Sequence, residues 1–177
     1  MIWESRYWKK PLLETAKRLT KLKSVPSPTQ RHLVQIEKDI FVGFYSVRKL
    51  IEAPTKVSDA TRTMTVAVAW HANVKPVNLR NNHRIDELYD LEKSQWETRD
   101  IWFISSRIMH SFIFSPVFNE QGIEGIFFTS DTDKDKKLYL LPVDTVIDVF
   151  ERVGHDYPNH ISYNCDPDTG TETTVVK

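Results

Sequence analysis

The sequence FIFSPVFNEQGIEGIFFTSDTDKDKKLYLL, residues 112–141, contains three β-prone runs separated by two polar turns. The runs are 112–118, 123–130 and 138–141, and the turns between them are 119–122 and 131–137. Aromatic and β-branched residues favour strands, and short polar segments with glycine or aspartate favour the turns of hairpins. Consecutive strands joined by short turns run antiparallel. This stretch therefore predicts an antiparallel sheet in the second half of the chain.

Helices are predicted on both sides of this stretch. In the clearest one, apolar residues recur at steps of three and four from Leu33 to Ile51, which is typical of a helix face packed on a core. The residues 27–30, SPTQ, form a capping-box pattern at its start, and Pro54 marks its end. An earlier helix is predicted to begin at Pro11, because proline is favoured at the first helical position.

Two further helices and one strand complete the prediction. A central helix is expected over 95–113, because SQWE at 94–97 reads as a second capping box. A C-terminal helix is expected from Pro142 to Gly154, and the alternating residues 63–70 predict a strand. We therefore expect a single α+β domain over 1–177, with two N-terminal helices, a central helix and a C-terminal helix packed on a mainly antiparallel sheet. Residues 155–177 are expected to form a loop-rich C-terminal tail around a turn, DPDTG.

Composition excludes several classes of protein. The 177 residues are 40% apolar and 27% charged, close to the globular average, with no apolar run long enough to cross a bilayer. The N-terminus lacks the apolar region of a signal peptide, and Cys165 is the single cysteine, so we expect a soluble cytoplasmic protein without disulfides. The net charge of zero combines a basic half with an acidic one. Residues 1–80 hold 15 Lys and Arg against 6 Asp and Glu, whereas residues 81–177 hold 9 against 18.

The N-terminal segment is the first candidate site. It places two tryptophans among cations, and the candidate binding residues are Trp3, Arg6, Trp8, Lys9 and Lys10. Large aromatic and basic side chains are enriched in interfaces, so the segment favours docking on a protein partner or on a second copy. Stacking on nucleic acid, helped by the basic N-terminal half, is an alternative. Packing of the tryptophans onto the domain's own core is another.

A second candidate site lies on the predicted central helix. Its polar face carries Arg107 and His110 one turn apart, where a guanidinium that stabilises phosphorane charge and an imidazole acid or base could cleave RNA without metal. Arg99 or Arg80 would then contact phosphate. The pair superficially resembles that of helical ribonucleases of the HEPN class, but its spacing is shorter than theirs, so the sequence assigns no family. An ordinary solvated helix face is the alternative interpretation.

Other motifs argue against cofactor chemistry. His155, His160 and Cys165 are spaced by five residues, which matches no tight zinc pattern. The chain has neither a glycine-rich phosphate loop nor a G-x-S-x-G elbow. We therefore expect no metal and no cofactor. The sequence favours a non-enzymatic interaction module that binds a protein partner, and it leaves open a small ribonuclease or a nucleic-acid-binding module without catalysis.

Overall fold

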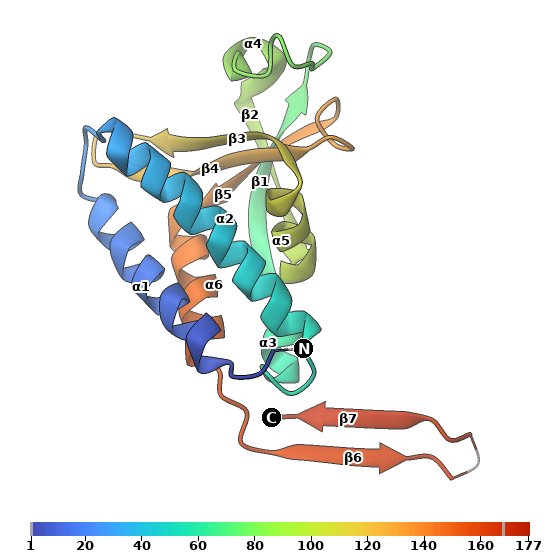
Figure 1. The fold of residues 1–177 in the computed structure, drawn as a ribbon. Coiled ribbons are helices and arrows are strands. Elements are labelled where there is room, and N and C mark those ends of the chain that lie inside the picture. Colours follow the sequence, from blue (N-terminus) through green and yellow to red (C-terminus); the bar gives the residue numbers. More distant parts are fainter. Residues whose placement is uncertain (1, 168) are drawn as a thin grey trace.

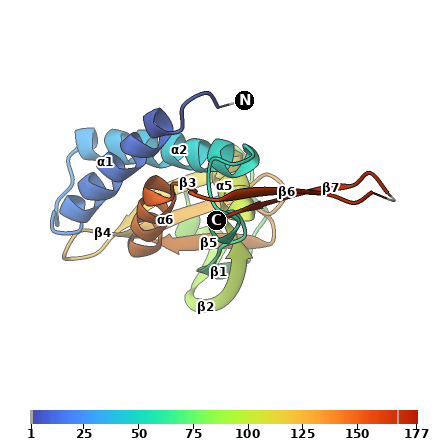
Figure 2. The ribbon, with the colours of Figure 1, turned by 90° about the horizontal axis from the view of Figure 1, so that it is seen from below.

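The computed structural model describes residues 2–167 and 169–177, and its main feature is a five-stranded sheet with helices on one face (Figures 1 and 2). In chain order the elements are α1 (Arg6–Leu22), α2 (Gln30–Glu52), α3 (Asp59–Arg62), β1 (Thr65–Asn73), α4 (Ile85–Leu88), β2 (Tyr89–Asp100), α5 (Ile101–Met109), β3 (Ser111–Phe118), β4 (Ile123–Ser130), β5 (Lys137–Pro142), α6 (Val143–His155), β6 (Ile161–Cys165) and β7 (Glu172–Val176). Helices α2, α5 and α6 contact the sheet, and α1 lies outside them against α2 and α6.

The sheet confirms the predicted fold class. Its strand order is β2-β1-β5-β4-β3, and every neighbouring pair is antiparallel. The β3–β4 and β4–β5 hairpins form as expected, because each strand alternates between the helix-covered face and the other face and is joined to the next by a polar turn. No helix among the described residues is long and apolar enough to cross a membrane.

The core lies between the helices and the sheet, and α2 supplies much of it. The predicted stripe is buried from Ile36 to Ile51, although Leu33 at its start is exposed. The ring of Phe44 contacts that of Phe150 from α6, with the ring centroids 5.1 Å apart. The two helices meet closely at Gly43, where an added Cβ would lie 2.3 Å from Cζ of Phe150. A side chain at position 43 would therefore displace a buried ring.

Both N-terminal helices begin at residues other than those predicted. Helix α1 begins at Arg6, so Pro11 lies inside it, where its ring removes one intrahelical hydrogen bond. The first turns form because Trp8 packs against the core and Lys9 is buried. Helix α2 is capped by Thr29 rather than Ser27: the Thr29 hydroxyl accepts from the backbone N–H of His32, and His32 Nδ1 accepts from that of Thr29.

The central helix predicted over 95–113 is wrong in its first third and at its end, where the helix stops at Met109 and β3 begins at Ser111. Residues up to Asp100 belong to β2, which pairs with β1 in a register that places Trp96 opposite Ala69. Strand pairing supplies the backbone hydrogen bonds that the local pattern had assigned to a helix, and tertiary pairing of this kind overrides local propensity. The helix itself, α5, is short and is capped by Asp100, whose Oδ1 accepts from the N–H of Phe103 at 2.7 Å.

The position of this cap leads to a first prediction. Replacing Asp100 with alanine is expected to lower the free energy of unfolding by about 1 kcal/mol, because the first turn of α5 loses its side-chain acceptor. Ser94→Ala is the matched control, since Ser94 lies in a strand and caps no helix. Its effect is expected to stay within about 0.5 kcal/mol. Urea denaturation of the two variants checks this, and a larger loss in Ser94→Ala would contradict the observed helix start.

The C-terminal tail forms a β-hairpin. Strands β6 and β7 make a separate two-stranded sheet, and the residues predicted as a turn, 166–170, connect them in sequence, with residue 168 outside the described residues. The hairpin is anchored at its base, where Val176 is buried and its N–H donates to Asp59 Oδ2 at 2.9 Å. Beyond that base it projects away from the helices and the five-stranded sheet (Figures 1 and 2). The tail that we expected to be rich in loops therefore contains regular structure.

Candidate interaction surface

The backbone of the N-terminal segment is held in place. Ile2 is buried in the main core, and Lys56 Nζ donates to the carbonyl oxygen of Trp3 at 3.3 Å. The backbone N–H of Arg6 donates to Glu4 Oε1 at 3.2 Å. The side chain of Trp3 nevertheless points into solvent and is 93% exposed. A large aromatic side chain is thus presented to solvent from an anchored backbone.

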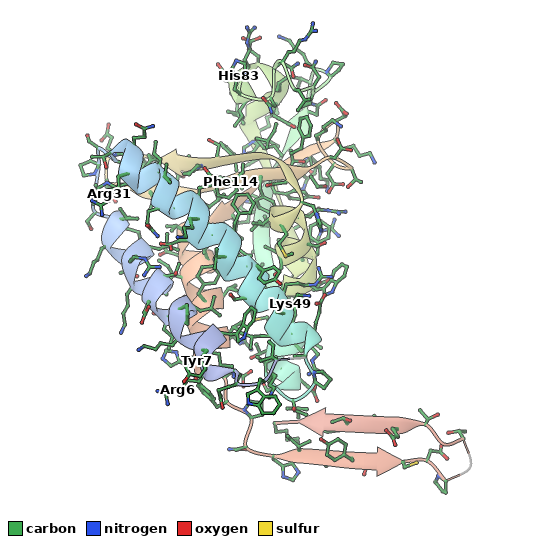
Figure 3. All side chains as sticks on the ribbon, viewed as in Figure 1. Arg6, Tyr7, Arg31, Lys49, His83 and Phe114 are labelled. Atoms are coloured by element: carbon green, nitrogen blue, oxygen red, sulfur yellow. The ribbon has the colours of Figure 1, made fainter. Side chains whose placement is uncertain are left out.

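Three more exposed side chains extend this feature along the start of α1. Tyr7 is 75% exposed, and Arg6 and Lys10 are exposed on the same first two turns. Figure 3 shows Arg6 and Tyr7 projecting from the beginning of the helix, away from the sheet. We call Trp3, Arg6, Tyr7 and Lys10 the N-terminal surface. Tyr7 was not among the predicted residues, because a helix expected to begin at Pro11 assigned it no face.

Trp8 takes a different place from Trp3. Its side chain is half-buried against the core, and its ring lies 6.1 Å from that of Tyr45 on α2. The two rings border a hollow of about 470 Å³ between the N-terminal segment and the end of α2, together with Lys49 and Pro54. The packing that we weighed for both tryptophans therefore applies to Trp8 and not to Trp3.

Lys9 lies inside the protein. Its side chain is fully buried. Its Nζ donates to the carbonyl oxygen of Lys56 at 2.7 Å and to the carbonyl oxygen of Asp156. The same Nζ lies 4.1 Å from the ring centroid of Tyr157. Burial lowers the pKa of Lys9, and the nearby Asp156 carboxylate opposes part of that change. The side chain joins α1 to residues far along the chain. It cannot face a partner, although the sequence had placed it among the binding residues.

Arg107, one of the two candidate catalytic residues, is already paired. Its Nε lies 2.6 Å from Asp133 Oδ2 in the β4–β5 turn, and its guanidinium lies 4.8 Å from the ring centroid of Phe103. His110 follows α5 as its C-cap, and within the described residues no hydrogen bond or ion pair involves its side chain. Arg107 is therefore ion-paired with Asp133, and among the described residues no hydrogen bond or ion pair joins it to His110.

Arg99, a proposed phosphate contact, belongs to the same cluster. It stacks on Phe103 at 4.7 Å, and its Nε donates to Glu97 Oε1 at 2.7 Å. Lys137 Nζ donates to the other oxygen of Glu97 at 2.6 Å. Burial raises the pKa of Glu97, but the hydrogen bonds from Arg99 and Lys137 together with their positive charges outweigh burial, so the pKa of Glu97 lies below its usual value. The cations of this cluster fix α5 against the edge of the sheet and are not free for phosphate.

The remaining candidates do not converge on a site. Arg80 lines a separate hollow of about 560 Å³ beside Phe112 and Lys134. His155 ends α6, whereas Cys165 is exposed near the tip of the hairpin. In the part of the chain that the structure describes, no group of three His, Cys, Asp or Glu residues is arranged to hold a metal ion.

The N-terminal surface is therefore the candidate site that the geometry supports best. It combines two exposed aromatic rings with two exposed cations on a fixed backbone, which suits contact with apolar and acidic groups. No protein-family model, curated protein or solved structure matches the chain.

Proposed function

We propose that this protein is a non-enzymatic cytoplasmic interaction module that binds a protein partner through its N-terminal surface. The observation that carries the proposal is the 93% exposure of Trp3 on a backbone anchored on both sides. Transfer of the apolar surface of an exposed tryptophan from water into a partner's pocket is favourable. Because the backbone is already ordered, binding would cost little additional conformational entropy.

The chemistry of the surface indicates what the partner offers. Trp3 and Tyr7 require an apolar pocket, and Arg6 and Lys10 favour carboxylates at its rim. Residues of this kind at the centre of an interface typically contribute about 2 kcal/mol or more when truncated. Since Arg107 and Arg99 are held by carboxylates in the structure, the observations favour this binding function over the alternative of RNA cleavage.

The second prediction tests this proposal. Partners captured from a lysate of the source cells on the immobilised wild-type protein are compared with those captured on Trp3→Ala. A partner that depends on Trp3 is then purified and titrated by calorimetry. We expect Trp3→Ala to weaken its binding by about thirtyfold or more, which corresponds to about 2 kcal/mol.

Trp96→Ala is the matched control, because Trp96 is also exposed but lies on β2. The control is expected to bind like the wild type. Equal capture of every partner by the wild type and Trp3→Ala would overturn the proposal. A ligand that proves to be nucleic acid, with an affinity that falls steeply as salt is added, would replace it by the nucleic-acid alternative.

A further inference from the structure

The hydrogen-bonding pattern of the β6–β7 hairpin determines which of its backbone groups point outward. At its base, the backbone N–H groups of His160 and Lys177 each donate to the carbonyl oxygen of the other residue, at 3.1 and 2.9 Å. The next pair in the register, Ile161 with Val176, is then a non-hydrogen-bonded pair, because the two kinds of pair alternate along an antiparallel hairpin. The N–H and C=O groups of every second residue therefore point out of the hairpin: those of Ile161, Tyr163 and Cys165 on β6, and those of Glu172, Thr174 and Val176 on β7.

The two outer edges of the hairpin differ in what covers them. Figure 1 shows β7 on the side toward α3, where the N–H of Val176 donates to Asp59 Oδ2 at 2.9 Å. Strand β6 lies on the side away from α3, and among the described residues no other segment supplies partners for its outward backbone groups. Its side chains of Tyr163 and Ile161 are 72% and 41% exposed. Because a two-stranded sheet is only marginally stable in water, the outer edge of β6 is the place where a third strand would stabilise the hairpin.

Strand β6 also lacks the residues that protect the other sheet edges of the molecule. Charged side chains and prolines on an edge strand disfavour its pairing with another chain. The five-stranded sheet ends in β2, which carries charged residues such as Glu92, Lys93 and Arg99, and in β3, which contains Pro116. The sequence of β6 is ISYNC, with no charged residue and no proline. Its edge is therefore the least protected against the addition of a strand.

The β6 strand of a second copy matches this edge residue for residue. Two antiparallel copies related by a two-fold axis at Tyr163 place the two Tyr163 residues opposite each other and each Ile161 opposite Cys165 of the other copy. All these residues point their backbone groups outward, so each opposed pair exchanges two hydrogen bonds, whereas registers centred on Ser162 or Asn164 would pair only two of the three residues.

The side chains are compatible with the same register. Because β6 carries no charge, no like charges are opposed, and the two Tyr163 rings form a cross-strand aromatic pair, which is stabilising. The hairpin projects away from the helices and the five-stranded sheet, so its outer edge is accessible to a second molecule (Figures 1 and 2). We propose that two copies of the chain associate through the outer edges of β6, which joins the two hairpins into a four-stranded antiparallel sheet.

The third prediction tests this contact with proline substitutions. The N–H of Tyr163 points outward, so Tyr163→Pro is expected to keep the hairpin and to block the addition of a strand. Thr174→Pro is the matched control, because Thr174 lies opposite Tyr163 and its N–H points outward from the other strand. Sedimentation equilibrium of the full chain at increasing concentration measures the association. We expect the wild type and Thr174→Pro to dimerise alike, and the dissociation constant of Tyr163→Pro to be higher by about tenfold or more.

The size of the contact sets the concentration range. Each copy contributes the five residues of β6, so the interface is smaller than the roughly 800 Å² per partner of a standard stable complex. The dimer is therefore expected to be reversible, with a dissociation constant between about 1 μM and 1 mM.

A disulfide tests the register. In a Cys165→Ser background, Tyr163→Cys places one thiol of each copy at the two-fold axis, where the Cα atoms of a hydrogen-bonded pair are about 5.5 Å apart, a separation that a disulfide spans. Mild oxidation is expected to give a covalent dimer of this variant, and none of Thr174→Cys in the same background.

Four results would overturn the proposal. They are a wild type that stays monomeric up to about 1 mM, undiminished association of Tyr163→Pro, equal loss in the two proline variants, and a covalent dimer of the Thr174→Cys variant but not of the Tyr163→Cys variant. Trp3→Ala is expected to dimerise normally, which separates this result from that of the partner experiment.

Discussion

Lys9→Ala is expected to lower the free energy of unfolding by about 2–4 kcal/mol. The side chain is fully buried. Its ammonium group donates hydrogen bonds to the carbonyl oxygens of Lys56 and Asp156 and contacts the ring of Tyr157. Truncation leaves both carbonyls without their donor and opens a void around them. Lys10→Ala is the matched control, because the neighbouring side chain is exposed. Its effect is expected to stay within about 0.5 kcal/mol.

The difference in the free energy of unfolding between the wild type and Lys9→Ala should depend on pH, and the pKa of Lys9 gives the sign of this dependence. Burial lowers the pKa of Lys9 from its ordinary value of 10.5, so the folded protein releases this proton at lower pH than the unfolded chain does. As pH rises through the lowered pKa toward 10.5, the unfolded state binds more protons, and the wild type gains stability relative to Lys9→Ala. Chemical denaturation at several alkaline pH values measures the difference, and a difference that shrinks over this range would contradict the burial of the charged group.

Gly43→Ala is expected to destabilise the protein by about 1–3 kcal/mol, even though alanine is the better helix former by about 1 kcal/mol. The added Cβ would lie 2.3 Å from Cζ of Phe150, whose ring is buried against Phe44. Val42→Ala, at an exposed position of the same helix, is the control and is expected to be nearly neutral.

A double variant isolates the cause of this loss. Phe150→Leu removes the end of the ring that blocks position 43, so Gly43→Ala should cost much less in the Phe150→Leu background. The coupling between the two substitutions is expected to exceed about 0.5 kcal/mol. Thermal unfolding of the four proteins measures it, and strict additivity would show that the close approach of α2 and α6 is not the source of the effect.

The elements that the sequence predicts well have local causes. The β3–β5 hairpins follow from alternating apolar residues and polar turns, and α2 follows from a stripe that its own spacing defines. Residues 94–100 carry no such pattern. They form a strand because they pair with β1, whose backbone groups supply their hydrogen bonds. The partner strand lies some 30 residues earlier in the chain, as the pairing of Val66 with Arg99 shows.

The candidate site was predictable only in part. Aromatic and basic composition identifies the N-terminal segment, but it does not distinguish the exposed Trp3 from the half-buried Trp8. The burial of Lys9 depends on carbonyl groups 47 and 147 residues away, which no local pattern reveals. Likewise, Asp133 reaches Arg107 only through the folded β4–β5 turn.

Residues 56–59 connect the two ends of the chain, and this has a consequence for synthesis. The carbonyl oxygen of Lys56 accepts from Lys9 Nζ. The backbone N–H and the hydroxyl of Ser58 donate to Asp156 Oδ2, and Asp59 Oδ2 accepts from the backbone N–H of Val176. These last two partners emerge from the ribosome about a hundred residues after the segment that they complete, with sequence separations of 98 and 117. Residues 56–59, which include the lysine that holds the backbone of Trp3, therefore gain all their contacts only after residues 156 and 176 have been synthesised, so a shorter nascent chain lacks part of the support behind the N-terminal surface.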